Sequence, residues 1–239
     1  MFGISSFCLH KEPLDVALEQ LSEVTELVEI MDDGPHFIDS IELLESYSLR
    51  YALHAPSRSI NIASLHEPIR KASVEVISGC FLLAGEVNAD VVIHPGYFAW
   101  EEEQGRALRQ FSKSLFDLTT LADACSVRFY LENMGNWNYF FLRYPDEIDL
   151  LGEFGLALDV GHAHLNHCLD EFLARPFHHV HLHDNNGIED SHDAIGHGTI
   201  GFDAVMKAVE RDHATQIIEV ATFEGVIESL EYLGSKIIG

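Results

Sequence analysis

The stretch HVHLHDNNGIEDSHDAIGHGTIGF, residues 179–202, combines a short apolar strand pattern with five histidines and four acidic residues. In its first part, His181 and His183 alternate with apolar residues. This alternation is typical of a strand that turns the histidines to one face and the apolar side chains to the other. The Asp-Asn-Asn-Gly sequence that follows is typical of a turn. A solvated polar loop would explain the acidic residues but not two histidines on one face of a buried strand, so the pattern favours a metal site.

Similar apolar runs alternate with helical patterns along the whole chain. The expected strands are residues 2–8, 27–31, 49–54, 90–94, 127–132, 155–159, 179–183 and 216–220. The expected helices are residues 13–22, 65–86, 101–124, 168–174, 202–212 and 224–233. This order predicts an α/β fold, a (β/α)₈ TIM barrel that forms a single domain over residues 1–239. A doubly wound open sheet is the alternative, but no GxGxxG sequence follows the first strand.

The charge of the chain argues against polyanionic partners. Fourteen lysines and arginines stand against 39 acidic residues, a formal net charge of −25. Such a surface repels DNA and anionic membranes at long range, so DNA is not the expected partner. No apolar run reaches the roughly 18 residues of a membrane span. Four scattered cysteines and the lack of a signal-like N-terminus predict a cytoplasmic location. The oligomeric state is not defined by these features.

Ionisable residues fall at the ends of successive predicted strands. These residues are His54, His94, Glu132, Asp159, His181 and Glu219. One histidine at a strand end is usually a hydrogen-bonded core residue, but six such ends in succession are hard to reach by chance. The carboxyl ends of barrel strands converge on the face that carries the active site. We therefore expect these side chains to meet there.

Three further residues, His162, Asp190 and His192, complete a set of nine candidate ligands. Mixed imidazoles and carboxylates suit Zn, Mn or similar ions, whereas calcium and magnesium prefer oxygen ligands only. Nine ligands exceed the need of one tetrahedral zinc and suit two or three ions. Such ions can polarise a carbonyl or phosphoryl oxygen. Glu132 and Glu219, on the fifth and eighth strands, are also placed to act as base and acid across a bound substrate.

Several motifs together resemble the xylose-isomerase-like TIM-barrel superfamily, which contains endonuclease IV and many sugar (phosphate) isomerases and epimerases. The motifs are HAPSRSINIA at 54–63, IHPG at 93–96, LEN at 131–133, LDVGHAHL at 158–165, HLHDNNGIEDSHDAIGHGTIGF at 181–202 and IIEV at 217–220. Each is weak alone, but the ordered set is specific and spans nearly the whole chain.

The two branches of this superfamily imply different metal sites. Resemblance to endonuclease IV implies that all nine residues (His54, His94, Glu132, Asp159, His162, His181, Asp190, His192 and Glu219) hold three zinc ions. Resemblance to the isomerases and epimerases implies one divalent ion on Glu132, Asp159, His181 and Glu219, with the two glutamates moving a proton through an enediol-like intermediate. The expected cofactor is thus Zn or Mn, with one to three ions per chain.

Residues near the expected cavity suggest the substrate. Endonuclease IV has an aromatic residue after the HAP motif, where this chain has Ser57 and Arg58. Arg58 is a candidate ligand for a substrate phosphate, and Trp100 and Trp137 are candidates for stacking on a sugar ring. His183 is a candidate substrate contact, a partner that orients a metal ligand or Asp184, or a metal ligand itself. For each of these four residues an ordinary structural role is the alternative.

Two enzyme functions follow, and a third hypothesis is a barrel that binds a ligand without chemistry. The first function is a divalent-metal-dependent isomerase or epimerase that acts on a small sugar or sugar phosphate. The second is a multi-zinc phosphoesterase that resembles endonuclease IV and acts on abasic-site DNA or a smaller phosphoester. The acidic surface and the short loops favour the first, and the complete set of nine ligands favours the second. Both glutamates being present weighs against the third.

Overall fold

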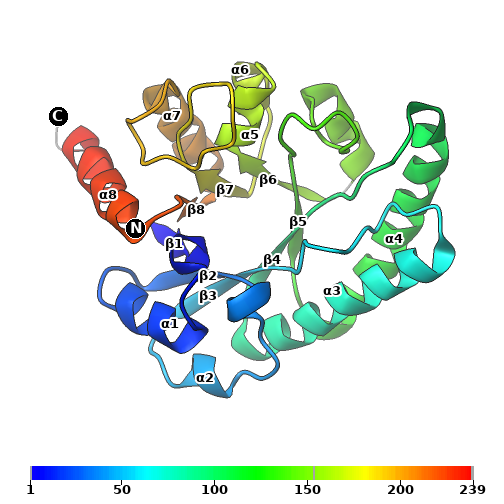
Figure 1. Cartoon of the computed structure of the whole chain (residues 1–239), viewed down its shortest axis with the longest axis horizontal. Helices are drawn as coiled ribbons and strands as arrows, with labels where there is room; N and C mark the ends of the chain where they lie inside the picture. The colour runs from blue at the N-terminus through cyan, green and yellow to red at the C-terminus, as the bar shows by residue number, and fades with distance from the viewer. Residues whose placement is uncertain (1, 153, 238–239) are drawn as a thin grey trace.

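The chain forms a closed barrel of parallel strands surrounded by helices, seen in a computed structural model that describes residues 2–152 and 154–237 (Figure 1). The strands are β1 (Gly3–Ser5), β2 (Leu27–Met31), β3 (Arg50–His54), β4 (Asp90–Ile93), β5 (Phe129–Glu132), β6 (Gly155–Asp159), β7 (His179–Leu182) and β8 (Thr215–Ile218). Each strand pairs with the next one along the chain, and β1 also pairs with β8. The expected single-domain (β/α)₈ TIM barrel is confirmed.

Helices connect the strands and cover the outside of the barrel (Figure 1). They are α1 (Leu14–Ser22), α2 (Glu42–Glu45), α3 (Glu67–Val87), α4 (Gln104–Cys125), α5 (Val160–Leu165), α6 (Leu169–Leu173), α7 (Phe202–Asp212) and α8 (Phe223–Ile237). Short 3-10 helices are η1 (Ser6–Leu9), η2 (Gly34–His36), η3 (Glu101–Glu103) and η4 (Pro145–Leu151). None of the helices in the described part of the chain combines the length and apolar composition needed to cross a bilayer.

Several local features differ from the expected elements, and three of them affect the site. The first strand ends at Ser5, whose hydroxyl accepts the Phe7 N–H and starts the 3-10 helix η1. Strand β8 ends at Ile218, so Glu219 lies just beyond it. Helix α5 was not expected; it begins because the Asp159 carboxylate accepts the backbone N–H of His162 at 2.7 Å, which satisfies one free donor of the first turn.

The two faces of the strands have different surroundings. Apolar side chains on the outer face, such as Leu53, Leu131 and Val180, join one large core with the helices. The inward-facing side chains include a small separate apolar cluster of Val92, Tyr130 and Ala157. Many other inward positions are polar and buried, unlike the branched apolar layers that usually fill such a barrel. Polar residues therefore occupy much of the barrel axis toward the carboxyl ends of the strands.

Candidate metal centre

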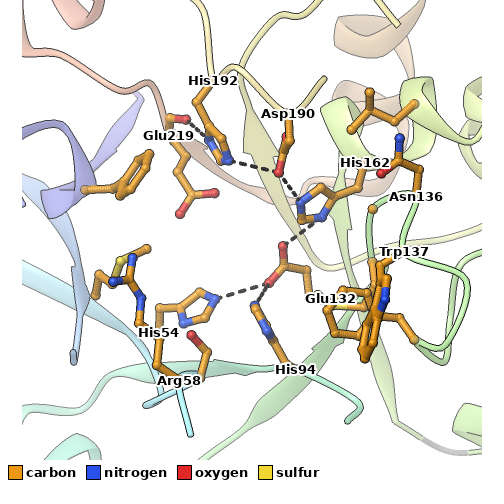
Figure 2. Close-up of a pocket in the computed structure, with 17 residues that line it drawn as sticks. His54, Arg58, His94, Glu132, Asn136, Trp137, His162, Asp190, His192 and Glu219 are labelled. Atoms are coloured by element: carbon orange, nitrogen blue, oxygen red, sulfur yellow. Dashed lines mark hydrogen bonds and ion pairs between the residues drawn. The ribbon is translucent and has the colours of Figure 1, made fainter. Parts of the chain in front are cut away.

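A cavity of about 360 Å³ opens at the carboxyl ends of the barrel strands (Figure 2). Sites for small molecules typically measure roughly 300–1,000 Å³. Its wall includes seven of the nine predicted ligands, namely His54, His94, Glu132, His162, Asp190, His192 and Glu219. The other two, Asp159 and His181, are fully buried directly behind the wall. The cavity thus has the size and the polar lining of a small-molecule site.

Glu132, the last residue of β5, connects the histidines of the site. Its Oε2 lies 3.2 Å from Nε2 of His54 and 3.1 Å from Nε2 of His94. Its Oε1 lies 3.3 Å from Nδ1 of His162 and 3.5 Å from Nδ1 of His181. One buried carboxylate therefore joins side chains from four different segments of the barrel rim.

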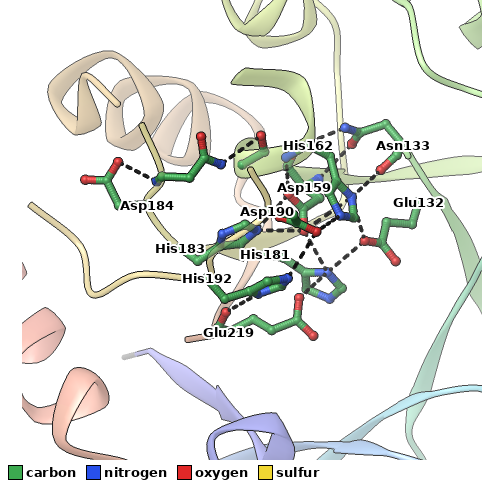
Figure 3. A network of polar contacts seen from close by, with 12 residues as sticks. Glu132, Asn133, Asp159, His162, His181, His183, Asp184, Asp190, His192 and Glu219 are labelled. Carbon is green, nitrogen blue, oxygen red and sulfur yellow. Dashed lines mark hydrogen bonds and ion pairs between the residues drawn. The ribbon is translucent and has the colours of Figure 1, made fainter. Parts of the chain in front are cut away.

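Asp159, the last residue of β6, is fixed by hydrogen bonds on several sides. The side chain of Asn133 accepts the Asp159 N–H at 2.7 Å and donates to the Asp159 carbonyl at 2.9 Å, which ties the ends of β5 and β6 together. Oδ1 of Asp159 accepts from His183 at 3.0 Å (Figure 3). The remaining oxygen, Oδ2, lies 3.6 Å from Nδ1 of His162 and 3.9 Å from Nδ1 of His181. Asp159 thus presents one oxygen to the site in a fixed direction.

The loop after β7 carries Asp190 and His192 and is held by Asp184. The carboxylate of Asp184 accepts the N–H groups of Asn185, Gly196 and Ile200 at 2.9–3.1 Å. This folded loop places Oδ2 of Asp190 3.0 Å from Nε2 of His162 and 3.5 Å from Nε2 of His192. Loop residues far along the chain from β6 therefore reach the same site.

Backbone carbonyls orient three of the histidines. Nδ1 of His54 lies 3.0 Å from the Ala55 carbonyl, Nδ1 of His162 lies 2.9 Å from the Asn133 carbonyl, and Nδ1 of His192 lies 2.8 Å from the Glu219 carbonyl. A carbonyl oxygen can only accept, so each Nδ1 carries the hydrogen. When the ring is neutral, the lone pair of Nε2 points away from the carbonyl and is open to a cation, which is the tautomer that a metal ligand requires.

Charges in the site shift the pKa values of its buried groups. Burial raises the pKa of Glu132, but the facing imidazoles of His94 and His162 outweigh this effect and hold it well below its ordinary value. Burial lowers the pKa of His181, but the Glu219 and Glu29 carboxylates outweigh it and raise that pKa well above 6.5. The Glu132 carboxylate is thus ionised at neutral pH, and its surroundings favour positive charge.

The side chains fit one or more divalent cations. The predicted ligands form overlapping groups whose donor atoms all lie within 4.8 Å of one another. The groups are His54–His94–Glu132, Glu132–Asp159–His162, Asp159–His181–Glu219 and His162–Asp190–His192. Buried carboxylates beside neutral imidazoles are the donor set preferred by zinc and manganese. The structure therefore brings all nine predicted ligands together, with a donor chemistry that suits a cation.

The predicted substrate-binding residues lie in different places. Arg58 and Trp137 line the cavity on different sides (Figure 2). Trp100 is 66% exposed and does not line this cavity. His183 is fully buried behind Asp159, with its ring stacked on His192 at 3.9 Å between centroids. The placement of His183 fits a partner that orients a metal ligand, and neither Trp100 nor His183 is positioned to touch a molecule in the cavity.

The sequence motifs did not predict a role for two residues near the site. Glu29 on β2 and His179 on β7 are fully buried inside the barrel. Each Glu29 oxygen lies 2.8 Å from an Nε2 atom, one of His179 and one of His181. The available signal was an acidic residue in the middle of the apolar run LVEIM at 27–31.

The fold and site define a TIM barrel with a candidate metal centre at its carboxyl-terminal face. The chain belongs to the family described as the xylose isomerase-like TIM barrel, whose model matches residues 32–236. The resemblance inferred from the sequence motifs is thereby confirmed.

Individual relatives are similar over nearly the whole chain. The uncharacterised protein MJ1614 of Methanocaldococcus jannaschii is 38% identical over 215 residues, covering 87% of this chain and 86% of the relative. A crystal structure of a D-tagatose 3-epimerase-like protein is 28% identical, with a TM-score of 0.91 over 99% of this chain and 96% of that chain. D-psicose 3-epimerase from Clostridium cellulolyticum H10, solved with D-tagatose, has the same fold at 14% identity, with a TM-score of 0.72 over 92% and 83% of the two chains.

Proposed function

We propose that this protein is a divalent-metal-dependent isomerase or epimerase of a small sugar or sugar phosphate. The observation that carries the proposal is the placement of Glu132 and Glu219. Both carboxylates face the middle of the cavity from β5 and from the end of β8 (Figure 2). Asp159 and His181 lie immediately behind them. The similarity to a D-tagatose 3-epimerase-like protein supports the same reaction class.

The four residues Glu132, Asp159, His181 and Glu219 would hold the cation. Nδ1 of His181 lies 3.3 Å from Oε2 of Glu219, 3.5 Å from Oε1 of Glu132 and 3.9 Å from Oδ2 of Asp159, so all three carboxylates lie around this nitrogen. When bound, a divalent cation would orient two neighbouring substrate oxygens and stabilise negative charge on the carbonyl oxygen.

The two glutamates would move the proton. One glutamate takes the hydrogen from the carbon next to the substrate carbonyl, and the electrons of that C–H bond form the double bond of an enediol-type intermediate. The other glutamate, which is protonated in the substrate complex, donates its proton to the opposite face of the same carbon and so inverts it. Ser5 supports this arrangement, because its hydroxyl lies 3.5 Å from Oε1 of Glu219.

Deuterium incorporation tests the proposal. Protein loaded with manganese or zinc is incubated in deuterated water with a panel of ketopentoses, ketohexoses and their phosphates. We expect deuterium at the carbon next to the carbonyl of one sugar, together with its epimer or isomer. If the protein binds metal and no sugar in the panel gains deuterium, the proposal fails.

A multi-zinc phosphoesterase is the second candidate. The group His162, Asp190 and His192 favours it, because a one-ion isomerase does not require these ligands. Two measurements separate the candidates: the number of ions per chain and the cleavage of an oligonucleotide with one abasic site. Three tightly bound ions with cleavage support the phosphoesterase, whereas one ion without cleavage supports the isomerase.

A further inference from the structure

His181 is turned the opposite way from His54 and His192. Backbone carbonyls hold the Nδ1 atoms of His54 and His192, so their Nε2 atoms face the site. His181 instead directs Nδ1 toward the site, 3.3 Å from Oε2 of Glu219. Its Nε2 points toward the interior of the barrel. The backbone carbonyls of the strands there already accept hydrogen bonds within the sheet, so none is free to accept the Nε2–H.

For His181, a carboxylate and not a backbone carbonyl is the acceptor for the ring nitrogen that faces away from the site. Oε1 of Glu29 on β2 lies 2.8 Å from Nε2 of His181. Oε2 of Glu29 lies 2.8 Å from Nε2 of His179, one step further down β7. The three side chains form a column inside the barrel, and all are fully buried. An ionised carboxylate only accepts, so both facing nitrogens carry the hydrogen.

A column of this kind is costly without a compensating charge. A buried carboxylate loses several kcal/mol of hydration. The Glu29 oxygens and the ring nitrogens of both histidines also lack hydrogen bonds of regular geometry within the described chain. Apolar residues would fill the barrel interior at lower cost. A cation held by Nδ1 of His181 would supply positive charge and make the Nε2–H a stronger donor to Glu29.

We infer that Glu29 is a positioning residue of the metal centre. It fixes the ring of His181 so that Nδ1 is free of hydrogen and directed at the ion, while His179 holds the second oxygen of Glu29. This inference rests on the proposed divalent-metal site. Outer partners of metal-bound histidines typically change metal affinity by about 10- to 100-fold.

The zinc affinity of Glu29→Gln, measured by competition with a chelator, tests the inference. We expect a loss of about 10- to 100-fold relative to the wild type. The matched control is Asp32→Asn, which also removes a buried carboxylate just after the same strand. The Asp32 carboxylate accepts the Ile38 N–H at 2.7 Å; the contact of Asp32 with a candidate ligand is through its backbone N–H, which donates to the His54 carbonyl at 3.0 Å and which the substitution keeps. Its variant should lose stability but keep the wild-type zinc affinity.

Three outcomes are decisive. Equal zinc affinity for Glu29→Gln and the wild type overturns the inference. A wild type that binds no zinc overturns the proposed function instead. A Glu29→Gln variant that loses one ion per chain while the other ions keep their affinity would show that the column is itself a metal site, which also overturns the inference.

A double variant tests whether Glu29 acts through His181. In a His181→Ala background, adding Glu29→Gln should change zinc affinity by less than about twofold, because the residue that Glu29 orients is gone. If the full 10- to 100-fold loss persists in that background, Glu29 acts by long-range charge and the inference fails.

If the variants do not fold, a measurement on the wild-type protein still tests the inference. In the zinc-loaded protein labelled with ¹⁵N-histidine, NMR should place the hydrogen of His181 on Nε2 and the metal on Nδ1. A hydrogen on Nδ1 of His181 contradicts the inference.

Discussion

Nε2 of His162 lies 3.0 Å from Oδ2 of Asp190, although His162 belongs to helix α5 and Asp190 to the loop after β7. His192 shares the same carboxylate at 3.5 Å. These residues form a ligand group next to the four residues proposed for epimerase chemistry, and they connect to them through His162 and Asp159. The role of this group decides between the two candidate functions.

The double variant Asp190→Asn with His192→Gln tests that role. In an epimerase with one ion, this change removes no proposed ligand, so one ion should remain and deuterium exchange should fall by at most about tenfold. In a three-ion phosphoesterase it should remove at least one ion and abolish cleavage of a phosphoester. Ion content by mass spectrometry and both activities are measured on the same preparation. Loss of all metal together with all exchange would contradict the four-residue ligand set.

Single glutamate variants test the two-base mechanism. With Glu132→Gln or Glu219→Gln, net epimerisation should fall by about 10²- to 10⁴-fold, because one proton transfer loses its catalyst. The remaining glutamate can still exchange the proton on its own face. Each variant should therefore incorporate deuterium into one epimer without inverting it, and the two variants should label opposite epimers. Metal content is measured in parallel, since both residues are also proposed ligands.

Labelling of the same epimer by both variants would contradict the assignment of one glutamate to each face. Full epimerisation by either metal-loaded variant would remove that glutamate from the mechanism.

Because Gly161 has no side chain, the ring of His183 can pack against it beside Asp159. A Cβ added at Gly161 would lie 2.0 Å from Cε1 of the His183 ring. Gly161→Ala should therefore displace His183, release Asp159 and lower the free energy of unfolding by about 1–3 kcal/mol. The control is Gly79→Ala in helix α3, where an added Cβ meets no atom within 4 Å. That variant should be neutral or more stable by up to about 1 kcal/mol.

Urea unfolding and zinc affinity are measured for both glycine variants. A Gly161→Ala protein with wild-type stability and wild-type affinity would show that the contact between His183 and Asp159 does not matter.

The barrel and its nine candidate ligands were predictable because both follow from local patterns. Each of His54, Glu132 and Asp159 ends an apolar run, and parallel strands of a barrel bring such ends to one face. Helix α5 was missed because it has only six residues, and its start depends on the Asp159 carboxylate rather than on an apolar period.

The column of Glu29, His179 and His181 depends on contacts across the barrel. Glu29 is separated from β7 by 150 residues or so in sequence, and the register of eight strands decides that they meet. The apolar run around Glu29 predicts a buried strand but not which face turns inward. Likewise, the exposed position of Trp100 depends on the path of the loop after β4, which no periodicity encodes.

A variant of Arg58, which lines the cavity, can test whether the substrate carries a phosphate. The backbone N–H of Arg58 and that of Ser57 are held by the Asp33 carboxylate at 3.3 and 2.8 Å, while no described residue pairs with the Arg58 guanidinium. If the substrate carries a phosphate, Arg58→Gln should raise KM at least tenfold with little change in kcat, because a charged hydrogen bond contributes about 1.5–3 kcal/mol.

The matched control is Arg106→Gln on helix α4, which removes an exposed arginine that does not line this cavity. Steady-state kinetics with a sugar and its phosphate measure both variants. An unchanged KM for the phosphate in Arg58→Gln would indicate that Arg58 does not bind the substrate.

The stability of the metal-free protein should fall as pH rises. Burial lowers the pKa of His54, but Glu132 outweighs burial and raises it from 6.5 to about 9. Burial likewise lowers the pKa of His192, but Asp190 raises it to about 9. Because these folded-state values exceed the unfolded one, the protonated rings stabilise the fold fully below about pH 6.5, and this stabilisation is lost as pH rises through 9. The free energy of unfolding should decrease by about 3 kcal/mol for each of the two histidines between these limits.

A bound divalent cation should reverse this dependence. Protons and the cation compete for the same imidazoles, so metal affinity should rise over the same range of pH, and the loaded protein should keep its stability at high pH. Urea unfolding at several pH values, with a chelator or with excess zinc, measures both effects. The variant His54→Gln with His192→Gln is the control and should lose most of the pH dependence in the metal-free state. Because the carboxylates hold protons on these rings only while no cation is present, a metal-free protein that gained stability toward pH 9 would contradict the charge arrangement proposed for the centre.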